Sequence, residues 1–328
     1  MHDKNLRMKI FVDLVLPPDA MDLLRNGTTG HELLLSRSPA ASVLAKPEPD
    51  PRFAAAQIAF GQPDPQAIAA STQLKWIQVS SSGITRFDSP QFRALMAERK
   101  IAVSNSAGVY AEACAVHVLS FILAQARNLP LALKTRTSSG APAWTALRHS
   151  STTLRGETVL ILGYGAIGAR LAELLHPLGV KVIAFRRQPR GDEKIPVVTE
   201  SGLPAALGQA RHIVNILPDS PQTRYFFDFR RFAALKSDAI FYNIGRGTTV
   251  DQSALLRALR SNQIAAAWLD VTDPEPLPDD HPLWQEPRCF ITPHIAGGHA
   301  GEYNALVQHF IENFKRFIRG EVLVDRVM

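Results

Sequence analysis

Short apolar runs alternate with amphipathic segments through the first hundred residues of the chain. Runs rich in β-branched and aromatic residues predict strands, and segments with apolar positions at helical spacing predict helices. The expected strands are 8–16, 31–36, 56–61, 74–81 and 100–105, and the expected helices are 17–26, 63–71 and 89–99. A proline-rich segment at 41–53 predicts a loop or a marginal helix. Strands and helices in alternation indicate a parallel α/β sheet.

A long apolar segment separates this region from a second alternation of the same kind. Residues 111–133 predict one long helix, and the polar, aperiodic residues 134–151 predict an exposed loop or an inter-subunit arm. The second set of strands is expected at 158–163, 181–186, 212–218, 239–245, 264–271 and 289–294, and its helices at 167–179, 201–210, 230–238, 252–262 and 301–320. The pattern therefore predicts the α/β class, with two doubly wound parallel-sheet domains, one on each side of the long helix.

Composition and charge narrow the function classes. The chain has 328 residues, enough for two domains, and its net charge of +6 is scattered rather than gathered into a basic stripe. We therefore expect no nucleic-acid partner, and a mildly cationic protein suits anionic small molecules. Two cysteines, Cys114 and Cys289, cannot form a disulfide framework and indicate a reducing compartment. The N-terminal apolar run is too short for a signal peptide, and no apolar segment approaches membrane-spanning length, so we expect a cytoplasmic protein without a membrane partner.

A glycine-rich turn is the first feature that points to a ligand. Gly163, Gly165 and Gly168 form G-x-G-x-x-G between the apolar run "TVLIL" and the helical pattern "ARLAELL". The first glycine permits a tight turn, the second lets a pyrophosphate approach the backbone, and the third lets helix pack against strand. Free N–H groups at the helix N-terminus would then face the phosphates. The alternative is a tight strand-to-helix turn that binds nothing.

The end of the next strand bears on which dinucleotide is bound. An NAD site usually places Asp or Glu there, on the ribose 2′-hydroxyl, whereas this chain has Arg186 and Arg187. A guanidinium can pair with a 2′-phosphate. The sequence therefore favours NADP. The alternative is that both arginines are solvated and NAD binds without its usual acid.

Three further side chains follow the ends of later strands. Arg246 lies in "NIGRG", Glu275 in "LDVTDPEPLP" and His294 in "ITPHIAGG". Because ligands bind at the carboxyl ends of parallel strands, we expect these groups to meet there. A histidine braced by a carboxylate can donate a proton near neutral pH, and an arginine can grip a carboxylate and polarise a neighbouring carbonyl. Taken singly, each residue has a structural alternative: a core histidine, a surface ion pair or a polar loop.

In order along the chain, "LRGETVLILGYGAIG", "LPDSPQT", "NIGRGTTVDQSALLRAL", "LDVTDPEPLP" and "TPHIAG" resemble the D-isomer specific 2-hydroxyacid dehydrogenase family. The resemblance implies reversible hydride transfer between a nicotinamide cofactor and a 2-oxo acid, with Arg246, Glu275 and His294 as the catalytic residues. It implies a flavodoxin-like substrate domain at 1–104 plus 299–328, and an inserted Rossmann cofactor domain at 105–298, with the active site between them. Members of this family are commonly homodimers paired through the cofactor domain.

The same resemblance implies ligand contacts residue by residue, and it implies no metal site. The cofactor contacts would be Gly163, Gly165, Ala166, Ile167, Gly168, Arg186, Arg187, Leu217, Pro218, Thr223, Ile244, Gly245, Asp270 and Gly297, with Asp270 on the nicotinamide carboxamide. The substrate contacts would be Ser82, Gly83, Ile84, Tyr110 and Arg246, with the backbone turn 82–84 on the substrate carboxylate. Two positions depart from the family pattern. Val116 replaces a common acidic residue, and Tyr110, where a smaller polar residue is frequent, would narrow substrate choice or belong to the core.

The arginine pair resembles the NADP-preferring glyoxylate and hydroxypyruvate reductase members of this family. The sequence therefore favours a reductase of small 2-oxo acids that uses NADPH, with NAD as the other possible cofactor. Enzyme alternatives on the same fold are a phosphoglycerate dehydrogenase-like activity and the oxidation of formate or phosphite. A different class is a nucleotide-sensing, co-repressor-like binding protein that retains the catalytic residues.

Overall fold

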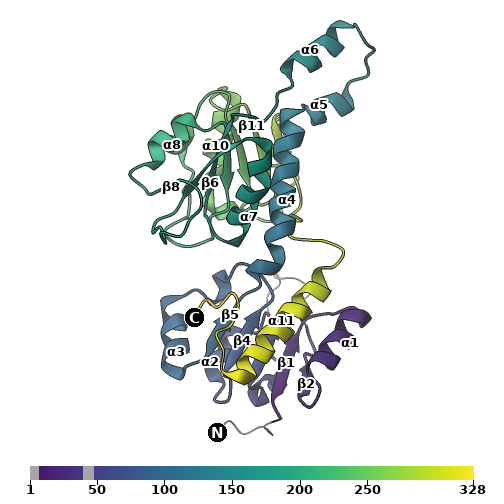
Figure 1. Cartoon of the computed structure of the whole chain (residues 1–328), viewed down its shortest axis with the longest axis vertical. Coiled ribbons are helices and arrows are strands. Elements are labelled where there is room, and N and C mark those ends of the chain that lie inside the picture. Colours follow the sequence, from purple (N-terminus) through teal and green to yellow (C-terminus); the bar gives the residue numbers. More distant parts are fainter. Residues whose placement is uncertain (1–6, 40–47) are drawn as a thin grey trace. The chain divides into compact units, whose positions relative to one another are not determined.

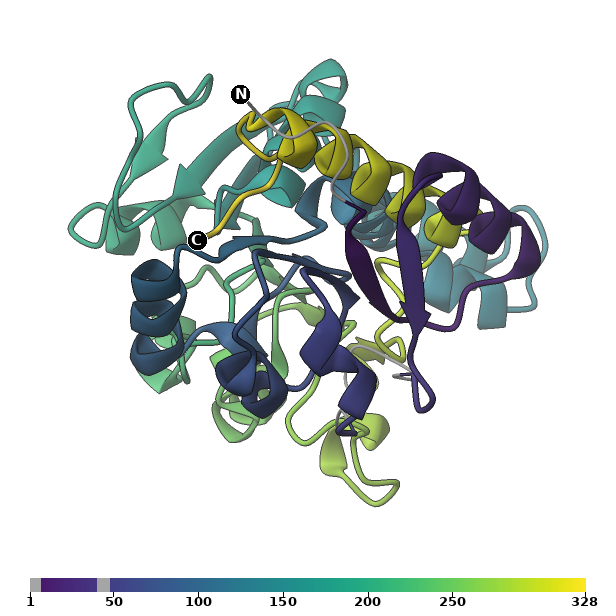
Figure 2. The same ribbon diagram turned by 90° about the horizontal axis from the view of Figure 1, so that it is seen from below.

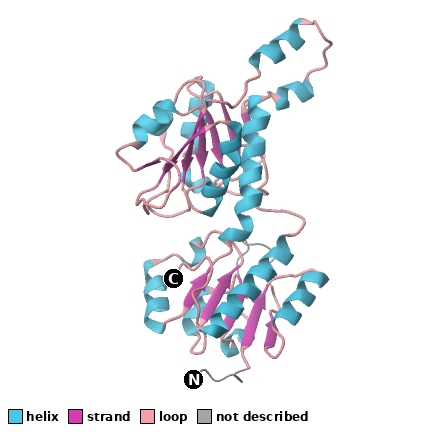
Figure 3. Ribbon diagram, viewed as in Figure 1, coloured by secondary structure: helices cyan, strands magenta, loops and turns pink. Residues whose placement is uncertain are grey.

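A computed structural model describes residues 7–39 and 48–328 of the chain. The chain divides into two compact units, of which unit 1 comprises residues 1–110 and 299–328, and unit 2 comprises residues 111–298. Each unit is built around its own parallel sheet, drawn in magenta in Figure 3. This confirms the expected α/β class with two parallel-sheet domains. The first junction lies at 110/111, six residues after the expected 104/105, and the second lies at the expected 298/299.

The sheet of unit 1 has the strand order β2-β1-β3-β4-β5 over the described residues. These strands are β1 (Lys9–Asp13), β2 (Glu32–Leu35), β3 (Ile58–Gly61), β4 (Trp76–Val79) and β5 (Ala102–Ser104). Every neighbouring pair is parallel, with registers such as Phe11↔Ala59 and Ile77↔Val103. An order of 2-1-3-4-5 is that of the flavodoxin-like doubly wound fold.

Helices cover both faces of this sheet. On one face, α1 (Pro18–Gly27) and α11 (Glu302–Arg319) pack on a cluster in which the Phe310 ring stacks on Trp76 and Phe60. On the other face, α2 (Pro65–Ala70) and α3 (Pro90–Arg99) pack over a second apolar cluster. Figure 2 shows α11 in yellow beside α1 in purple. The 3₁₀ turns η1 (Pro51–Ala55) and η2 (Thr85–Phe87) complete unit 1. η1 begins in the expected loop 41–53, of which residues 41–47 lie outside the described part.

The end of the chain is built into unit 1. After α11, the segment 324–328 runs antiparallel to β5, where Val327 N–H donates to the Val103 carbonyl at 2.8 Å and Ser104 pairs with Arg326. Asp325 Oδ2 accepts from the backbone N–H of Gly108 at 2.8 Å. The last thirty residues thus close the sheet that the first hundred residues begin, which makes unit 1 discontinuous in sequence.

The sheet of unit 2 has the strand order β12-β11-β10-β9-β6-β7-β8 in the described part of the chain. These strands are β6 (Thr158–Leu162), β7 (Lys181–Phe185), β8 (Val197–Val198), β9 (His212–Asn215), β10 (Ile240–Asn243), β11 (Ala266–Leu269) and β12 (Cys289–Ile291). With β6 counted as the first strand, the central order is 3-2-1-4-5-6, that of the Rossmann fold. Only β8 was not expected, because two residues are too short to show a period.

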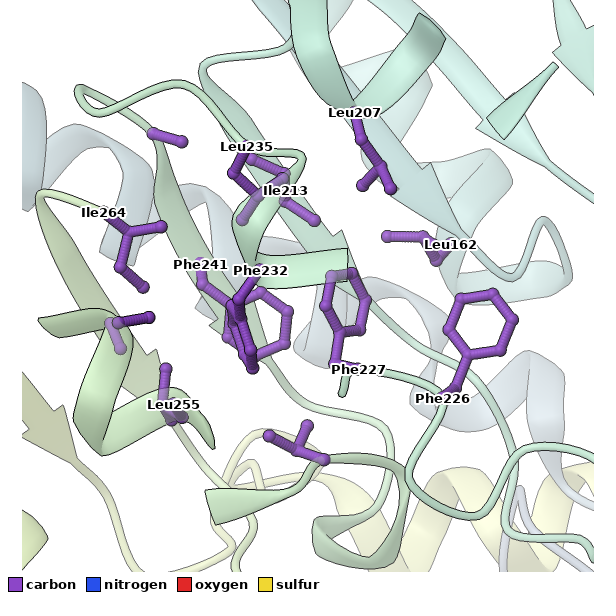
Figure 4. Packing of buried hydrophobic residues seen from close by; sticks show 14 of the residues in the cluster. Leu162, Leu207, Ile213, Phe226, Phe227, Phe232, Leu235, Phe241, Leu255 and Ile264 are labelled. Carbon is purple, nitrogen blue, oxygen red and sulfur yellow. The ribbon is translucent and has the colours of Figure 1, made fainter. Parts of the chain in front are cut away.

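Apolar side chains on one face of this sheet form a large core with α8 (Leu203–Gln209), α9 (Phe229–Ala233) and α10 (Gln252–Arg260). Phe227, Phe232 and Phe241 meet edge-on or tilted at its centre, with ring centroids 4.6–5.4 Å apart (Figure 4). The helices α4 (Ala107–Ala126) and α7 (Ala166–Leu175) lie on the other face, where Phe121 of α4 packs against Trp268 of β11. Shorter 3₁₀ turns are η3 (His176–Leu178), η4 (Gly247–Thr249) and η5 (Pro282–Gln285).

The expected helix at 111–133 is two helices. α4 ends at Ala126, and α5 (Leu129–Lys134) begins after Asn128, whose φ of +49° is left-handed. Pro130, which lacks an N–H group, occupies the first turn of α5, where no intrahelical donor is needed. The expected loop at 134–151 contains a further helix, α6 (Pro142–Ser150). Figure 1 shows α5 and α6 extending from the end of α4, away from the seven-stranded sheet.

The expectation that no apolar segment approaches membrane-spanning length is wrong for α4. Its 20 residues are long and apolar enough to cross a membrane by length and composition. The structure shows a packed helix instead: Cys114, Val118 and Ile122 are buried, and Gln125 accepts a hydrogen bond from Trp268 Nε1 at 2.8 Å.

Candidate active site

The candidate residues of unit 2 lie at one edge of its sheet. The turns after β6, β7, β9, β10, β11 and β12 all leave the carboxyl ends of parallel strands. Strand β6 lies between β7 and β9, so the chain order reverses at β6. Such a switch point is where open α/β sheets bind ligands.

The glycine turn after β6 has the geometry of a phosphate cradle. Gly163 has a φ of +97°, and a Cβ on Gly168 would lie 2.6 Å from the Gly163 carbonyl oxygen, so both positions require glycine. A Cβ on Gly165 would meet no atom within 4 Å, which leaves open space beside the backbone. α7 starts at Ala166, and the N–H groups of Ala166, Ile167 and Gly168 precede the first intrahelical bond, made by Ala169 to Gly165. These features fit a dinucleotide pyrophosphate.

At the end of β7 the two arginines differ. Arg186 is largely buried, with Nη1 3.2 Å from Glu193 Oε1. Arg187 is exposed. The Arg186 N–H donates to Val198 of β8, which fixes the backbone at this position.

Buried amides hold the turns after β9 and β10. Asn215 Nδ2 donates to Asn243 Oδ1 at 3.0 Å and to Thr249 Oγ1 at 2.7 Å. Asn243 Nδ2 and Thr249 Oγ1 in turn donate to the Arg246 carbonyl at 3.1 and 2.6 Å. Arg246 is thus carried on a backbone segment whose carbonyl is fixed from two sides.

The two turns also approach each other closely. A Cβ on Gly245 would lie 2.6 Å from the Leu217 carbonyl oxygen, so only glycine fits between them. Leu217 and Ile244 are each 6% exposed, and Thr223 Oγ1 donates to the Pro218 carbonyl at 2.5 Å, which closes the loop after β9. The cofactor contacts at these positions remain predictions.

The Arg246 guanidinium is largely desolvated. Burial lowers the pKa of Arg246 below its ordinary value, and the charges of Glu275 and Asp219 oppose that shift. The side chain still carries its charge at neutral pH, since arginine titrates far above it. Glu275 thus lies within electrostatic reach of Arg246.

Glu275 and His294 are in direct contact. His294 Nδ1 lies 2.5 Å from Glu275 Oε1, and the two side chains are 27% and 24% exposed. The bond at Nδ1 fixes the orientation of the ring and leaves Nε2 for a ligand. The predicted partners, nineteen residues apart in sequence, are therefore brought together.

Asp270 holds the loop that carries His294. Its Oδ1 accepts from Thr292 Oγ1 at 2.6 Å and from Ile295 N–H at 2.9 Å, and its Oδ2 accepts from Ala296 N–H at 2.9 Å. The His294 N–H donates to the Asp270 carbonyl at 2.9 Å. Asp270 is 2% exposed, so its visible role is to fix this loop, and its contact with the nicotinamide carboxamide stays a prediction. Gly297 follows in the same loop.

The loop that carries Glu275 is fixed by a residue that the sequence patterns did not reveal. Gln252 Nε2 donates to the Asp273 carbonyl at 2.6 Å, and Gln252 Oε1 accepts from the Asp273 N–H at 3.0 Å. The same loop lies against η4, where a Cβ on Gly247 would lie 1.9 Å from the Thr272 carbonyl oxygen. Gln252 is the first residue of α10, where a polar side chain is unremarkable, so no local pattern distinguishes it.

In unit 1, the turn 80–84 has its carbonyl groups occupied. Tyr110 Oη donates to the Ser80 carbonyl at 2.9 Å, and Ser106 N–H donates to the Ser81 carbonyl at 3.0 Å. Asn105 Nδ2 donates to the Ser82 carbonyl at 2.6 Å, and Ser81 Oγ donates to the Gly83 carbonyl at 2.6 Å. The turn therefore presents donors rather than acceptors.

The N–H groups of the same turn are available. Among the described residues, the N–H groups of Ser82, Gly83 and Ile84 find no acceptor. Successive free N–H groups form an anion-binding concavity, which suits a carboxylate. Gln62 Nε2 supports the turn from β3 by donating to the hydroxyls of Ser80 and Ser81 at 3.2 and 3.0 Å.

Tyr110 is half-buried, and its hydroxyl is engaged. Besides the Ser80 carbonyl, Tyr110 Oη lies 3.0 Å from Glu302 Oε1 at the start of α11. These contacts place Tyr110 between the turn and the last helix of unit 1. The sequence offered two roles for Tyr110, packing in the core and narrowing substrate choice. The structure shows contacts for the first role, and the second stays a prediction.

Residues 119–296 match the family described as D-isomer specific 2-hydroxyacid dehydrogenase, NAD binding domain. The chain is 35% identical to the mouse glyoxylate reductase/hydroxypyruvate reductase over 78% of this chain and 77% of that protein. It is 34% identical to the human protein of the same name, over 77% of this chain and 76% of that one. A D-isomer specific 2-hydroxyacid dehydrogenase from Xanthobacter autotrophicus, solved with NADPH and MES, is 26% identical with a TM-score of 0.77, over 98% of each chain.

We predict that Gly247→Ala lowers the free energy of unfolding by about 3 kcal/mol or more, because the new methyl group would collide with the Thr272 carbonyl at a buried position. Chemical unfolding followed by circular dichroism measures the change. Gly208→Ala is the matched control, since the nearest atom to its Cβ would lie 3.8 Å away and alanine favours the α8 helix. Equal stability of the two variants would contradict the close approach.

Proposed function

The chain belongs to the D-isomer specific 2-hydroxyacid dehydrogenase family, and from that premise we propose that it reduces a small 2-oxo acid, such as glyoxylate or hydroxypyruvate, with NADPH. Membership makes it an NAD(P)-dependent oxidoreductase. The observation that carries the finer proposal is the Glu275–His294 pair within electrostatic reach of the buried Arg246 guanidinium. The mouse and human relatives, named for glyoxylate and hydroxypyruvate, support this substrate class.

His294 supplies the proton. When bound, the nicotinamide cofactor supplies the hydride for the carbonyl carbon. The carbonyl oxygen takes a proton from His294 Nε2, because Nδ1 is engaged by Glu275, whose carboxylate stabilises the protonated ring. The 2-oxo acid thus gains one hydride and one proton and becomes a 2-hydroxy acid, while His294 is left neutral. In the reverse direction, neutral Nε2 accepts the hydroxyl proton.

Two groups bind the substrate anion in this proposal. The free N–H groups of Ser82, Gly83 and Ile84 donate hydrogen bonds to the carboxylate, and Arg246 pairs with it while polarising the neighbouring carbonyl. Burial strengthens the second interaction, since the Arg246 charge is poorly screened by water. A short 2-oxo acid needs no more than these contacts and a proton donor.

NADPH is the proposed hydride donor because cationic residues stand where an NAD site has an acid. Arg186 directly follows β7 and Arg187 is exposed beside it. The solved Xanthobacter relative contains NADPH, which supports the same choice. We also propose a cytoplasmic location, supported by a sequence that contains two cysteines, Cys114 and Cys289. Burial raises the pKa of the Cys289 thiol to about 12.

We predict that purified protein oxidises NADPH in the presence of glyoxylate or hydroxypyruvate, with a higher kcat/KM than with NADH. A crossed panel of 2-oxo acids against the two cofactors, followed by absorbance, measures this. The panel includes phosphohydroxypyruvate, and formate and phosphite are tested with NADP⁺ and NAD⁺. Turnover confined to one of these three would favour an alternative activity, and no turnover with any substrate would favour a nucleotide-sensing protein.

His294→Asn should lower kcat by about 10²-fold or more, because proton donation by a positioned group contributes that order of rate. Cofactor affinity should stay within about twofold, since neither imidazole nitrogen is assigned to the cofactor. His176→Asn, an exposed position after α7, is the control and should leave both quantities unchanged. If His294→Asn weakened cofactor binding and turnover to the same degree, the residue would be structural.

We further propose that the active form is a homodimer paired through unit 2. Apolar side chains are exposed along α4 and α5, with Val116 at 43%, Leu123 at 40%, Leu131 at 59% and Leu133 at 85%. An apolar surface of this kind on a well-packed unit marks an interaction site. The occupant we infer is a second copy of the chain, because members of this family commonly pair through the cofactor domain.

Leu131→Asp combined with Leu133→Asp should convert the protein from a dimer to a monomer, because two carboxylates cannot be buried without partners. Light scattering after size exclusion should change from about twice 36.0 kDa to 36.0 kDa. Val322→Asp, at a 74% exposed position in unit 1, should leave the dimer intact. A monomeric parent protein would exclude the proposed pairing.

A further inference from the structure

The loop after β7 folds around one of its own carboxylates. Glu193 Oε1 accepts from the Arg190 N–H at 2.8 Å, and Oε2 accepts from the Gly191 N–H at 2.8 Å. Oε1 also lies 3.2 Å from Arg186 Nη1, and the Glu193 side chain is only 6% exposed. These bonds keep the pKa of Glu193 below its ordinary value, with the Arg190 N–H as the largest cause. Glu193 is therefore a charged group fixed inside the loop.

This loop lies directly beside the glycine turn. The Gly163 N–H donates to the Phe185 carbonyl at 3.2 Å, and Arg186 is the next residue. Burial raises the pKa of Tyr164, between the first two glycines, and the charges of Glu173 and Glu193 add to that shift while Arg186 opposes it. Arg186 and Glu193 thus lie within electrostatic reach of the turn assigned to the cofactor phosphates.

Glu193 cannot take the part of the acid in an NAD site. That acid accepts a hydrogen bond from a ribose hydroxyl and must be accessible to it. Both carboxylate oxygens of Glu193 are already engaged by backbone N–H groups, and the side chain is almost fully covered. Glu193, seven residues after Arg186, therefore does not make this a site that selects NAD.

What Glu193 does is hold Arg186. The ion pair uses Nη1 and leaves Nε and Nη2 of the guanidinium without an acceptor among the described residues. Two parallel N–H groups of a guanidinium match the oxygens of a phosphate. Fixing one end of the guanidinium on a buried carboxylate removes the rotamer freedom that phosphate binding would otherwise cost.

We propose that Glu193 is a positioning residue for the 2′-phosphate of NADPH, acting by holding the Arg186 guanidinium in the orientation that binds it. The inference rests on the proposed use of NADPH. It assigns the two arginines different parts: Arg186 is the pre-oriented group, and exposed Arg187 adds charge beside it. Selectivity between the cofactors then depends on a residue that does not touch either of them.

The test compares Glu193→Ala and Glu193→Gln with Asp192→Asn, which removes the same charge from an exposed neighbour for which the structure shows no side-chain hydrogen bond. Calorimetric titration with NADPH and with NADH gives the affinities, and the KM of each cofactor and kcat are measured in parallel. Glu193→Ala should lower the affinity for NADPH about tenfold, which is the effect of losing one charge-assisted hydrogen bond. The affinity for NADH should stay within about twofold of the parent value. Glu193→Gln, which keeps one acceptor oxygen, should give a smaller loss, and Asp192→Asn none. kcat should not change, because the chemical step is at another turn.

Each other outcome overturns the inference. Tighter NADPH binding by the Glu193 variants would mean that this carboxylate repels the 2′-phosphate, and equal weakening of both cofactors would make the loop merely structural. If the parent protein prefers NADPH and the Glu193 variants keep the same ratio of NADPH to NADH affinity, the role of Glu193 is refuted while the proposed cofactor stands. A parent protein with no preference for NADPH would refute the proposed cofactor and this inference together.

Discussion

The arrangement of the proposed catalytic residues depends on how closely backbone turns approach one another at one edge of the seven-stranded sheet. Gly245 lies against the Leu217 carbonyl, and Gly247 lies against the Thr272 carbonyl, at distances that exclude a Cβ. These approaches bring the turns after β9, β10 and β11 into contact. Arg246 stands between the two glycines, so these approaches fix its backbone, and its Nη1 donates to the Gly245 carbonyl at 2.6 Å. A parallel sheet supplies the common edge, and the glycines make the edge dense enough for three side chains to act together.

His294 shows the same principle at the level of a single residue. Its φ of +54° is left-handed, a conformation that costs a non-glycine residue about 1–3 kcal/mol. Asp270 offsets that cost with one backbone carbonyl and two carboxylate oxygens, all bonded to residues 292–296. The result is an imidazole whose backbone is held by Asp270 and whose ring orientation is held by Glu275. Glu275 then needs to contribute a single contact, and Gln252 is enough to hold the loop it comes from.

The sequence could predict most of the fold and which residues follow the strand ends at the candidate site, because these depend on local patterns. Apolar runs gave the strands, and the glycine motif marked the turn. The break at Asn128 and the helix α6 were not predicted, since a single proline in a strongly apolar segment and a weak period in a polar one are ambiguous signals. Gln62, Asn105, Gln252 and Glu193 were not found because each acts through contacts that the fold brings together. A glutamine at position 62 is an ordinary polar residue until β3 and β4 pair, and only then does its amide reach Ser80 and Ser81.

The groups proposed to bind anions differ in charge between the two units, and we attribute this difference to the different charges of the proposed ligands. In unit 1 the turn 82–84 contains no arginine or lysine. Asn105, Ser106 and Tyr110 donate hydrogen bonds to carbonyl groups of the turn 80–84, whereas the N–H groups of 82–84 find no acceptor among the described residues. Neutral dipoles of this kind suit a singly charged carboxylate that must also leave. In unit 2 the groups proposed for anions include full charges, and two of the guanidinium groups have a carboxylate near them: Glu275 near Arg246, and Glu193 on Arg186. An unaccompanied buried cation would cost several kcal/mol in the empty protein. A fixed carboxylate offsets part of that cost and leaves the other face of the guanidinium for the ligand, so the same acid that stabilises the arginine charge also orients it.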